Sequence, residues 1–144
     1  MGRLVLDTNV LIYAVGDEHP LRRPCRALVD AIGDGQVSAT TTVEVLQEFA
    51  HVASRRRPRA DAAAQAIRFA ALLDPLLPLT SDDFASGLSL WQRHDSLGSL
   101  DAILAAACVA SGATLVSADK AFARVRGLDH VVPEARGVKR LIAG

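Results

Sequence analysis

Two short aliphatic runs that each lead into an acid constrain the fold of this chain more than any other feature. Residues 4–6 read Leu-Val-Leu before Asp7, and residues 114–116 read Thr-Leu-Val before Ser117 and Asp119. An apolar run that stops at polar residues, with an apolar helical pattern after it, indicates a buried strand passing into a helix. Each acid then lies at the carboxyl end of a strand, where open parallel sheets place their ligand sites.

Short strand patterns alternate with helical patterns along the rest of the chain. We predict strands at residues 3–6, 36–39, 76–79, 114–116 and 130–132. Helices are expected at about residues 9–14, 20–32, 41–54, 60–73, 80–91, 99–110 and 120–125, with a basic tail after the last strand. The run at 76–79 contains Pro78, which places it at a sheet edge. This alternation predicts a three-layer α/β/α sandwich with a five-stranded parallel sheet, in a single domain over residues 1–144.

The charge balance excludes some classes of partner. The 16 basic and 16 acidic residues cancel, so bulk charge gives no attraction to nucleic acid or to a membrane, although a local basic patch remains open.

No apolar run reaches the roughly 18 residues of a membrane span, and no signal peptide is evident, so we expect a soluble cytoplasmic protein. Cys25 and Cys108 lack zinc-site spacing and are expected to be buried, reduced thiols.

Four acids are predicted to share one rim of the sheet. Asp7 and Asp119 follow strands, and Glu44 and Asp101 fall near the amino-terminal ends of helices. Carboxylates that converge in a partly buried space repel one another, which raises their pKa values or requires a cation. Hard oxygen ligands favour Mg²⁺ or Mn²⁺, and attack of a metal-bound water on a phosphodiester is the reaction that such a site suits best.

Each acid also has a purely structural explanation. Glu44 stands three residues after Thr41, the spacing of a capping box, and Asp101 would complement a helix dipole. Asp7 and Asp119 could each cap the helix that follows a strand. Capping alone does not explain Asn9 two residues after Asp7, or Ser117 two residues before Asp119. Taken together, the polar residues therefore favour a reactive site.

Four segments in register carry a resemblance to a known family. They are Leu-Asp-Thr-Asn-Val-Leu-Ile at 6–12, Thr-Val-Glu-Val-Leu-Gln-Glu-Phe at 42–49, Leu-Asp-Ala-Ile-Leu-Ala-Ala-Ala at 100–107 and Val-Ser-Ala-Asp-Lys-Ala-Phe at 116–122. The set resembles the PIN-domain ribonucleases, in particular the VapC-type toxins of type II toxin-antitoxin pairs, over nearly the whole chain. The resemblance implies a PIN-like fold, a metal-dependent endoribonuclease, a homodimer and a cognate antitoxin whose tail blocks the acidic rim.

The resemblance also implies roles for single residues. The metal-binding and catalytic acids are Asp7, Glu44, Asp101 and Asp119. We expect the three aspartates to hold Mg²⁺, and Glu44 to position or deprotonate the attacking water. Asn9 corresponds to the support of the first acid, Ser117 to a residue that orients the substrate phosphate or its water, and Thr8 is grouped with these supports. Ala121 and Ala123 stand where members often carry another acid, so we predict one well-held ion.

An acidic nuclease site needs basic surroundings to bind RNA. We expect the main phosphate contacts from Arg55, Arg56 and Arg57, with Arg59 beside them, and further contacts from Arg22, Arg23 and Arg26. Tyr13 and Trp91 are the large amphipathic aromatics, which argues against a stacking platform for bases. The histidines show no ligand spacing and receive no role.

The helix at 41–54 is apolar on more than one side, which indicates cover from the core and from a partner. We predict that the surface around Leu46, Phe49 and Val52, with the helix after it, receives an antitoxin helix.

Two other functions compete with the nuclease. A phosphatase of the haloacid dehalogenase kind also begins with a strand that ends in Asp, but it needs a second Asp two residues later as general acid, and this chain has Asn9 there. The alternative of another class is a PIN-like RNA-binding or protein-interaction module without catalysis, against which the presence of all four acids argues.

Overall fold

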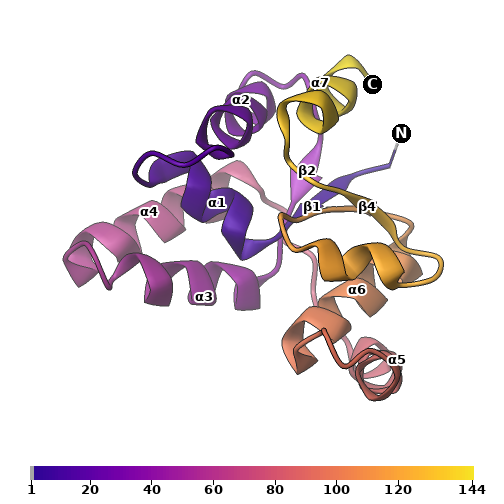
Figure 1. Cartoon of the computed structure of the whole chain (residues 1–144). Coiled ribbons are helices and arrows are strands. Elements are labelled where there is room, and N and C mark those ends of the chain that lie inside the picture. The colour runs from indigo at the N-terminus through magenta and orange to yellow at the C-terminus, as the bar shows by residue number, and fades with distance from the viewer. Residues whose placement is uncertain (1) are drawn as a thin grey trace.

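The computed structural model describes residues 2–144, which form a small parallel sheet with helices on both sides (Figure 1). The elements in chain order are β1 Leu4–Leu6, α1 Thr8–Val15, α2 Arg22–Gly33, β2 Ala39–Thr40, α3 Val43–Ala53, α4 Arg59–Leu72, α5 Ser81–Arg93, α6 Ser99–Ser111, β3 Thr114–Val116, the 3₁₀ helix η1 Lys120–Arg124, β4 Asp129–Val131 and α7 Ala135–Ala143. In Figure 1, α2 and α7 lie above the sheet, α5 and α6 lie below it, and α3 and α4 extend away from it as a pair.

The sheet of the described residues has four strands in the order β2-β1-β3-β4, and every neighbouring pair is parallel. The prediction of a parallel α/β fold is confirmed, but the prediction of five strands was wrong. Residues 76–79 run beside the edge, where the Leu77 N–H donates to the Thr41 carbonyl at 2.9 Å. Pro75, just before the segment, and Pro78, within it, have no N–H to donate, so the segment does not form a ladder.

The two central strands supply the middle of the core. Leu4, Val5 and Leu6 of β1 and Leu115 and Val116 of β3 have no exposed surface. Strands covered by helices on both faces read as continuous apolar runs, which is why the sequence identified these two so clearly. The rim beyond their carboxyl ends is therefore held by the best-packed part of the molecule.

The start of α3 has a side-chain cap that bears on the site. Thr42 caps α3 by accepting a hydrogen bond from the Val45 N–H at 3.1 Å, whereas the Thr41 hydroxyl donates to the Leu6 carbonyl at 2.7 Å. The possible capping box between Thr41 and Glu44 is therefore absent from the start of α3. The Glu44 side chain is exposed in the first turn.

The last helix, α7, covers residues for which we expected only a basic tail. It buries Val138 and Leu141, three residues apart, while Lys139 and Arg140 stay exposed. This two-residue apolar pattern, next to Gly137, is too short to predict a helix from periodicity.

Cys25 and Cys108 are both buried and unbridged, and burial raises the pKa of each thiol to about 12. This confirms the expectation of buried thiols. Across residues 2–144, none of the helices combines the length and the apolar character that a membrane crossing requires.

Candidate functional site

The site begins where β1 and β3 end side by side. Leu6 is paired with Val116 in the parallel register, and the Asp7 N–H continues the pairing by donating to the Val116 carbonyl at 3.0 Å. Asp7 and Ser117 therefore leave the sheet at the same level. The Ser117 hydroxyl donates to Asp7 Oδ2 at 2.7 Å, and both side chains are buried.

Asn9 joins the two strand ends. Its Nδ2 group donates to Ser117 Oγ at 3.1 Å and, at a longer 3.4 Å, to Asp7 Oδ2. Its Oδ1 accepts from the Ala118 N–H at 3.0 Å. Donor and acceptor of the amide are thus both engaged, which an aspartate at this position could not reproduce. These hydrogen bonds of Asn9 hold Asp7 against the loop that follows β3.

Ser117 lies where it organises the acids and does not reach solvent. Its oxygen accepts hydrogen bonds from Asn9 and, at 3.1 Å, from the Asp119 N–H, and it donates to Asp7. The residue has no exposed surface. The expectation that Ser117 orients a substrate phosphate therefore does not fit its surroundings, because its hydroxyl is enclosed by protein partners.

Glu48, and not the predicted Glu44, is the glutamate that α3 brings to this site. Thr8 connects it to Asp7, because the Thr8 hydroxyl donates to Glu48 Oε2 at 3.0 Å and the Thr8 N–H donates to Asp7 Oδ1 at 2.8 Å. The negative charge of Glu48 also raises the pKa of both Asp7 and Asp101. Glu44, one helical turn earlier, contributes to neither shift, so the structure does not bring it into the cluster.

Asp101 and Asp119 complete the group of acids. Asp101 stands in the first turn of α6, and Asp119 caps η1 by accepting from the Ala121 N–H at 2.9 Å. The pKa of Asp101 is raised to about 7, first by burial and then by the charges of Asp7, Asp119 and Glu48. The structure therefore gathers Asp7, Asp101 and Asp119 as predicted by their spacing, with Glu48 as the fourth.

Burial is also the main cause that raises the pKa of Asp7. The hydrogen bonds from Ser117 and from the Thr8 N–H oppose that effect, and the charges of Glu48 and Asp119 add to it. Two carboxyl groups with raised pKa values in one place indicate negative charge that the chain itself does not balance.

The donor set fits a hard divalent cation by charge and chemistry. All four members are carboxylates, which suit Mg²⁺ or Mn²⁺. The salt bridge found among residues 2–144 joins Arg56 to Asp17 and leaves these acids without a basic partner. Within the same residues, no three acidic, histidine or cysteine side chains are already arranged around one point as ion ligands.

The predicted phosphate-binding arginines lie at the other end of α1. Arg56 pairs with Asp17 at 3.2 Å, and Arg57 donates to the Val15 carbonyl at 2.8 Å. Since α1 rises about 1.5 Å per residue over its eight residues, this basic loop lies roughly 10 Å from the acids. The structure thus places Arg55, Arg56 and Arg57 near the site but not in it.

The predicted partner surface on α3 was wrong in two of its three residues. Leu46 is 7% exposed and Phe49 is 0% exposed. Phe49 meets the edge of Phe69 on α4 with ring centroids 5.2 Å apart, so the second apolar side of α3 packs on α4. Val52 is partly buried beside them.

Comparisons with known proteins agree on one family. The model of the PIN domain matches residues 4–128. The chain is 49% identical to ribonuclease VapC7 of Mycobacterium tuberculosis, with 96% of this chain and 97% of that protein covered. It is 32% identical to ribonuclease VapC23 of the same species, with coverage of 92% and 97%.

Solved structures resemble the fold at lower sequence identity. VapBC2 from Rickettsia felis, bound to a DNA fragment from its promoter, gives a TM-score of 0.68 at 18% identity, covering 88% of this chain and 96% of that one. FitAcB from Neisseria gonorrhoeae gives a TM-score of 0.67 at 15% identity, with coverage of 90% and 97%.

Proposed function

The chain belongs to the PIN-domain family as a VapC-type member, and we propose that it is an endoribonuclease that acts as the toxin of a type II toxin-antitoxin pair. The observation that carries the proposal is the cluster of Asp7, Glu48, Asp101 and Asp119 at the carboxyl ends of the central strands. The pKa values of Asp7 and Asp101 are raised there by burial and by the other acids. Perturbed acids in one place are a mark of a reactive centre.

We propose that the cluster holds Mg²⁺ or Mn²⁺ during the reaction. Asp7 and Asp101 are the more buried ligands, and Asp119 lies on the exposed rim, where its side chain can change rotamer to reach an ion. Such an ion lowers the pKa of a bound water and neutralises charge on the phosphate. Glu48 takes the role that we expected for Glu44, which is to position or deprotonate the attacking water.

The chain's own residues then have distinct tasks. Ser117 and Asn9 fix the carboxylate of Asp7, and the Thr8 hydroxyl fixes Glu48 at 3.0 Å. We assign Glu48 as the acceptor of the proton from the attacking water. The water oxygen bonds to phosphorus, the bond from phosphorus to the leaving oxygen breaks, and that oxygen takes a proton from solvent.

A single ion is proposed in the resting site. Ala121 and Ala123 in η1 offer no further carboxylate beside Asp119, so a second ion would need ligands from the RNA.

We also propose a cognate antitoxin that covers the acidic rim, a homodimer, and action in the cytoplasm. Apolar side chains suited to protein contacts are available outside the site. Ile67 is 70% exposed, Phe84 54% and Trp91 47%. Large apolar groups on the surface favour protein interfaces.

The test is cleavage of a cellular RNA pool by the purified protein, with Mg²⁺ or Mn²⁺ and with EDTA. Discrete products that depend on the metal are expected. Binding of RNA without any cleavage would favour the alternative of a PIN-like binding module instead.

A further inference from the structure

An aromatic pair lies on the surface between α1 and α2. The rings of Tyr13 and His19 are stacked, with centroids 3.9 Å apart and planes at 10°. His19 Nδ1 accepts a hydrogen bond from the Leu21 N–H at 3.0 Å, which fixes the imidazole in this position. His19 is exposed, so one face of its ring packs on Tyr13 while the side chain still meets solvent.

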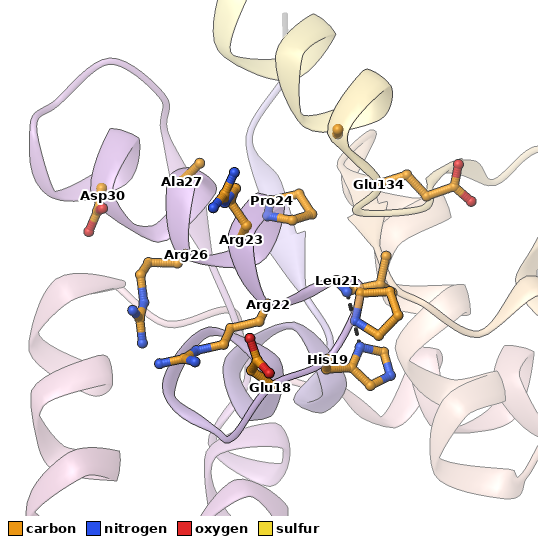
Figure 2. A pocket seen from close by; sticks show the side chains of 12 residues that line it. Glu18, His19, Leu21, Arg22, Arg23, Pro24, Arg26, Ala27, Asp30 and Glu134 are labelled. Atoms are coloured by element: carbon orange, nitrogen blue, oxygen red, sulfur yellow. Dashed lines mark hydrogen bonds between the residues drawn. The ribbon is translucent and has the colours of Figure 1, made fainter.

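His19 lies between two hollows of the surface, each with three arginines. The first hollow, of about 870 Å³, is shown in Figure 2 and includes Arg22, Arg23 and Arg26. The second, of about 490 Å³, includes Arg55, Arg56 and Arg57. His19 contributes to the walls of both. A flat ring flanked by guanidinium groups on two sides is the arrangement that single-stranded nucleic acid binds.

Some of these arginines are free of ion pairs among the described residues and can bind an anionic ligand. Within residues 2–144 neither Arg22 nor Arg23 forms a salt bridge. Figure 2 shows the carboxyl group of Glu134 pointing away from the three arginines. Against six arginines, the two hollows contain four acids, which are Asp17, Glu18, Asp30 and Glu134. The local charge is therefore positive in a chain of zero net charge.

The aromatic pair lies within reach of an RNA strand held at the acids. Tyr13 comes five residues after Thr8 on α1, about 7.5 Å along the helix axis. At about 3.4 Å per nucleotide in a stacked strand, this separation corresponds to roughly two or three nucleotides.

We propose that His19, supported by Tyr13, is a stacking platform for a base of the RNA substrate two or three nucleotides from the cleaved bond. Arg22 and Arg56 would contact the phosphates on either side. The proposal rests on the proposed ribonuclease function and adds a site that selects and positions the substrate. It replaces our expectation from the sequence that a stacking platform is absent and that the histidines have no role.

The test uses two substitutions that separate the ring from its hydrogen bond. His19→Asn keeps an acceptor for the Leu21 N–H but removes the ring, whereas His19→Trp keeps a flat aromatic surface. The substrate is an RNA of about 20 nucleotides that spans the strongest cleavage site found in the pool. Loss of a stacked base predicts a KM about 5- to 100-fold higher for His19→Asn, with kcat unchanged, and a KM near wild type for His19→Trp.

The outcomes separate this proposal from the function on which it rests. Wild-type cleavage with an unchanged KM in His19→Asn would overturn the platform and leave the ribonuclease standing. An unchanged KM together with weaker binding of the antitoxin would assign this surface to a protein partner instead. If the wild type cuts no RNA, the proposed function fails and the platform falls with it.

A second readout addresses the arginines. Arg22→Gln and Arg56→Gln should each reduce the slope of log KM against log salt by about 0.7, the value for one phosphate contact on a single strand. Arg68→Gln is the matched control, because Arg68 is exposed on α4 and lines neither hollow. Equal slopes for all three variants and the wild type would contradict the phosphate contacts.

Discussion

At the scale of single residues, Thr8 explains why one glutamate of α3 belongs to the site and the other does not. Its N–H binds Asp7 and its hydroxyl binds Glu48, so two acids from different elements share one small connector. Glu44 and Glu48 are four residues apart, and both are exposed. Sequence spacing alone cannot distinguish them, because the choice depends on where α3 passes α1.

Replacing each glutamate in turn tests this assignment. Glu48→Gln should lower kcat by about 100-fold or more, since a general base typically contributes 10²–10⁴-fold. Glu44→Gln, the matched control one turn away, should stay within about twofold of wild type. Initial rates on the same RNA substrate measure both. The opposite ranking would return the role to Glu44.

Ionisation of Asp101 should affect the stability of the fold as well as the activity. The Asp101 carboxyl has a pKa of 3.8 as its ordinary value and about 7 in the fold. Between these values the folded protein retains a proton that the unfolded chain has lost. The stability that comes from this group is therefore fully present below about pH 4 and is lost as the pH rises through 7.

Asp101→Asn should therefore stabilise the metal-free protein at pH 8 and have little effect at pH 4. At pH 8 we expect the free energy of unfolding to rise by about 1–2 kcal/mol after allowance for solvent screening. This corresponds to an increase in Tm of roughly 2–6 °C. Thermal unfolding in EDTA at the two pH values provides the measurement. An equal shift at both pH values would show that the charge is not the cause.

Several site residues could be predicted from the sequence because they follow strands directly. Asp7, Ser117 and Asp119 come at fixed offsets from the most apolar runs, and Asn9 comes two residues after Asp7. His19 could not be predicted in this way, because its role depends on the contact with Tyr13 across a turn. Such a contact leaves no periodic signal in the sequence.

At the scale of elements, the packing of α3 on α4 has replaced a predicted binding surface. Phe49 is fully buried and meets Phe69 edge to face. Phe49→Ala should therefore lower the free energy of unfolding by about 3–5 kcal/mol, the usual cost of removing a buried ring. Ile67→Ala on α4, 70% exposed, is the control and should change it by less than about 0.5 kcal/mol.

Urea unfolding of the two variants measures the difference. If Phe49→Ala proved as mild as Ile67→Ala, the pairing of α3 and α4 would not contribute to the core. A partner-binding assay should use exposed positions, because a charge at Phe49 would disturb the fold first.

The sequence predicted the central, apolar strands of the sheet more accurately than its edge strands. β1 and β3 were placed almost to the residue, whereas β2 and β4 were each shifted by a residue or more. The prediction of a strand at residues 76–79 failed because of Pro75 just before the run and Pro78 within it. A hydrophobic pattern alone does not show how many N–H groups are left to pair. α7 was missed because its buried face contains few residues.

At the scale of the whole molecule, a balanced net charge conceals a strong separation of charges. Acids gather at the ends of the central strands, and arginines gather around the far end of α1. The total alone would have argued against RNA as a partner, but the arrangement provides an acidic centre with basic surroundings.

The proposed homodimer is also a property of the whole chain. Sedimentation should give twice the 15.2 kDa mass of one chain at micromolar concentration. A mass of one chain throughout the concentration series would contradict the dimer. The exposed side chains of Phe84 and Trp91 would then be available for the antitoxin alone.

The most direct test of the account is a Mn²⁺ titration of RNA cleavage by the wild type and by Asp101→Asn. Both proteins would receive the same substrate after removal of metal by EDTA. We predict that the wild type regains cleavage with a saturable dependence on Mn²⁺, and that Asp101→Asn stays at least about 100-fold slower at every concentration. Equal rates for the two proteins, or full wild-type cleavage in EDTA, would contradict the claim that these acids form a metal-dependent ribonuclease centre.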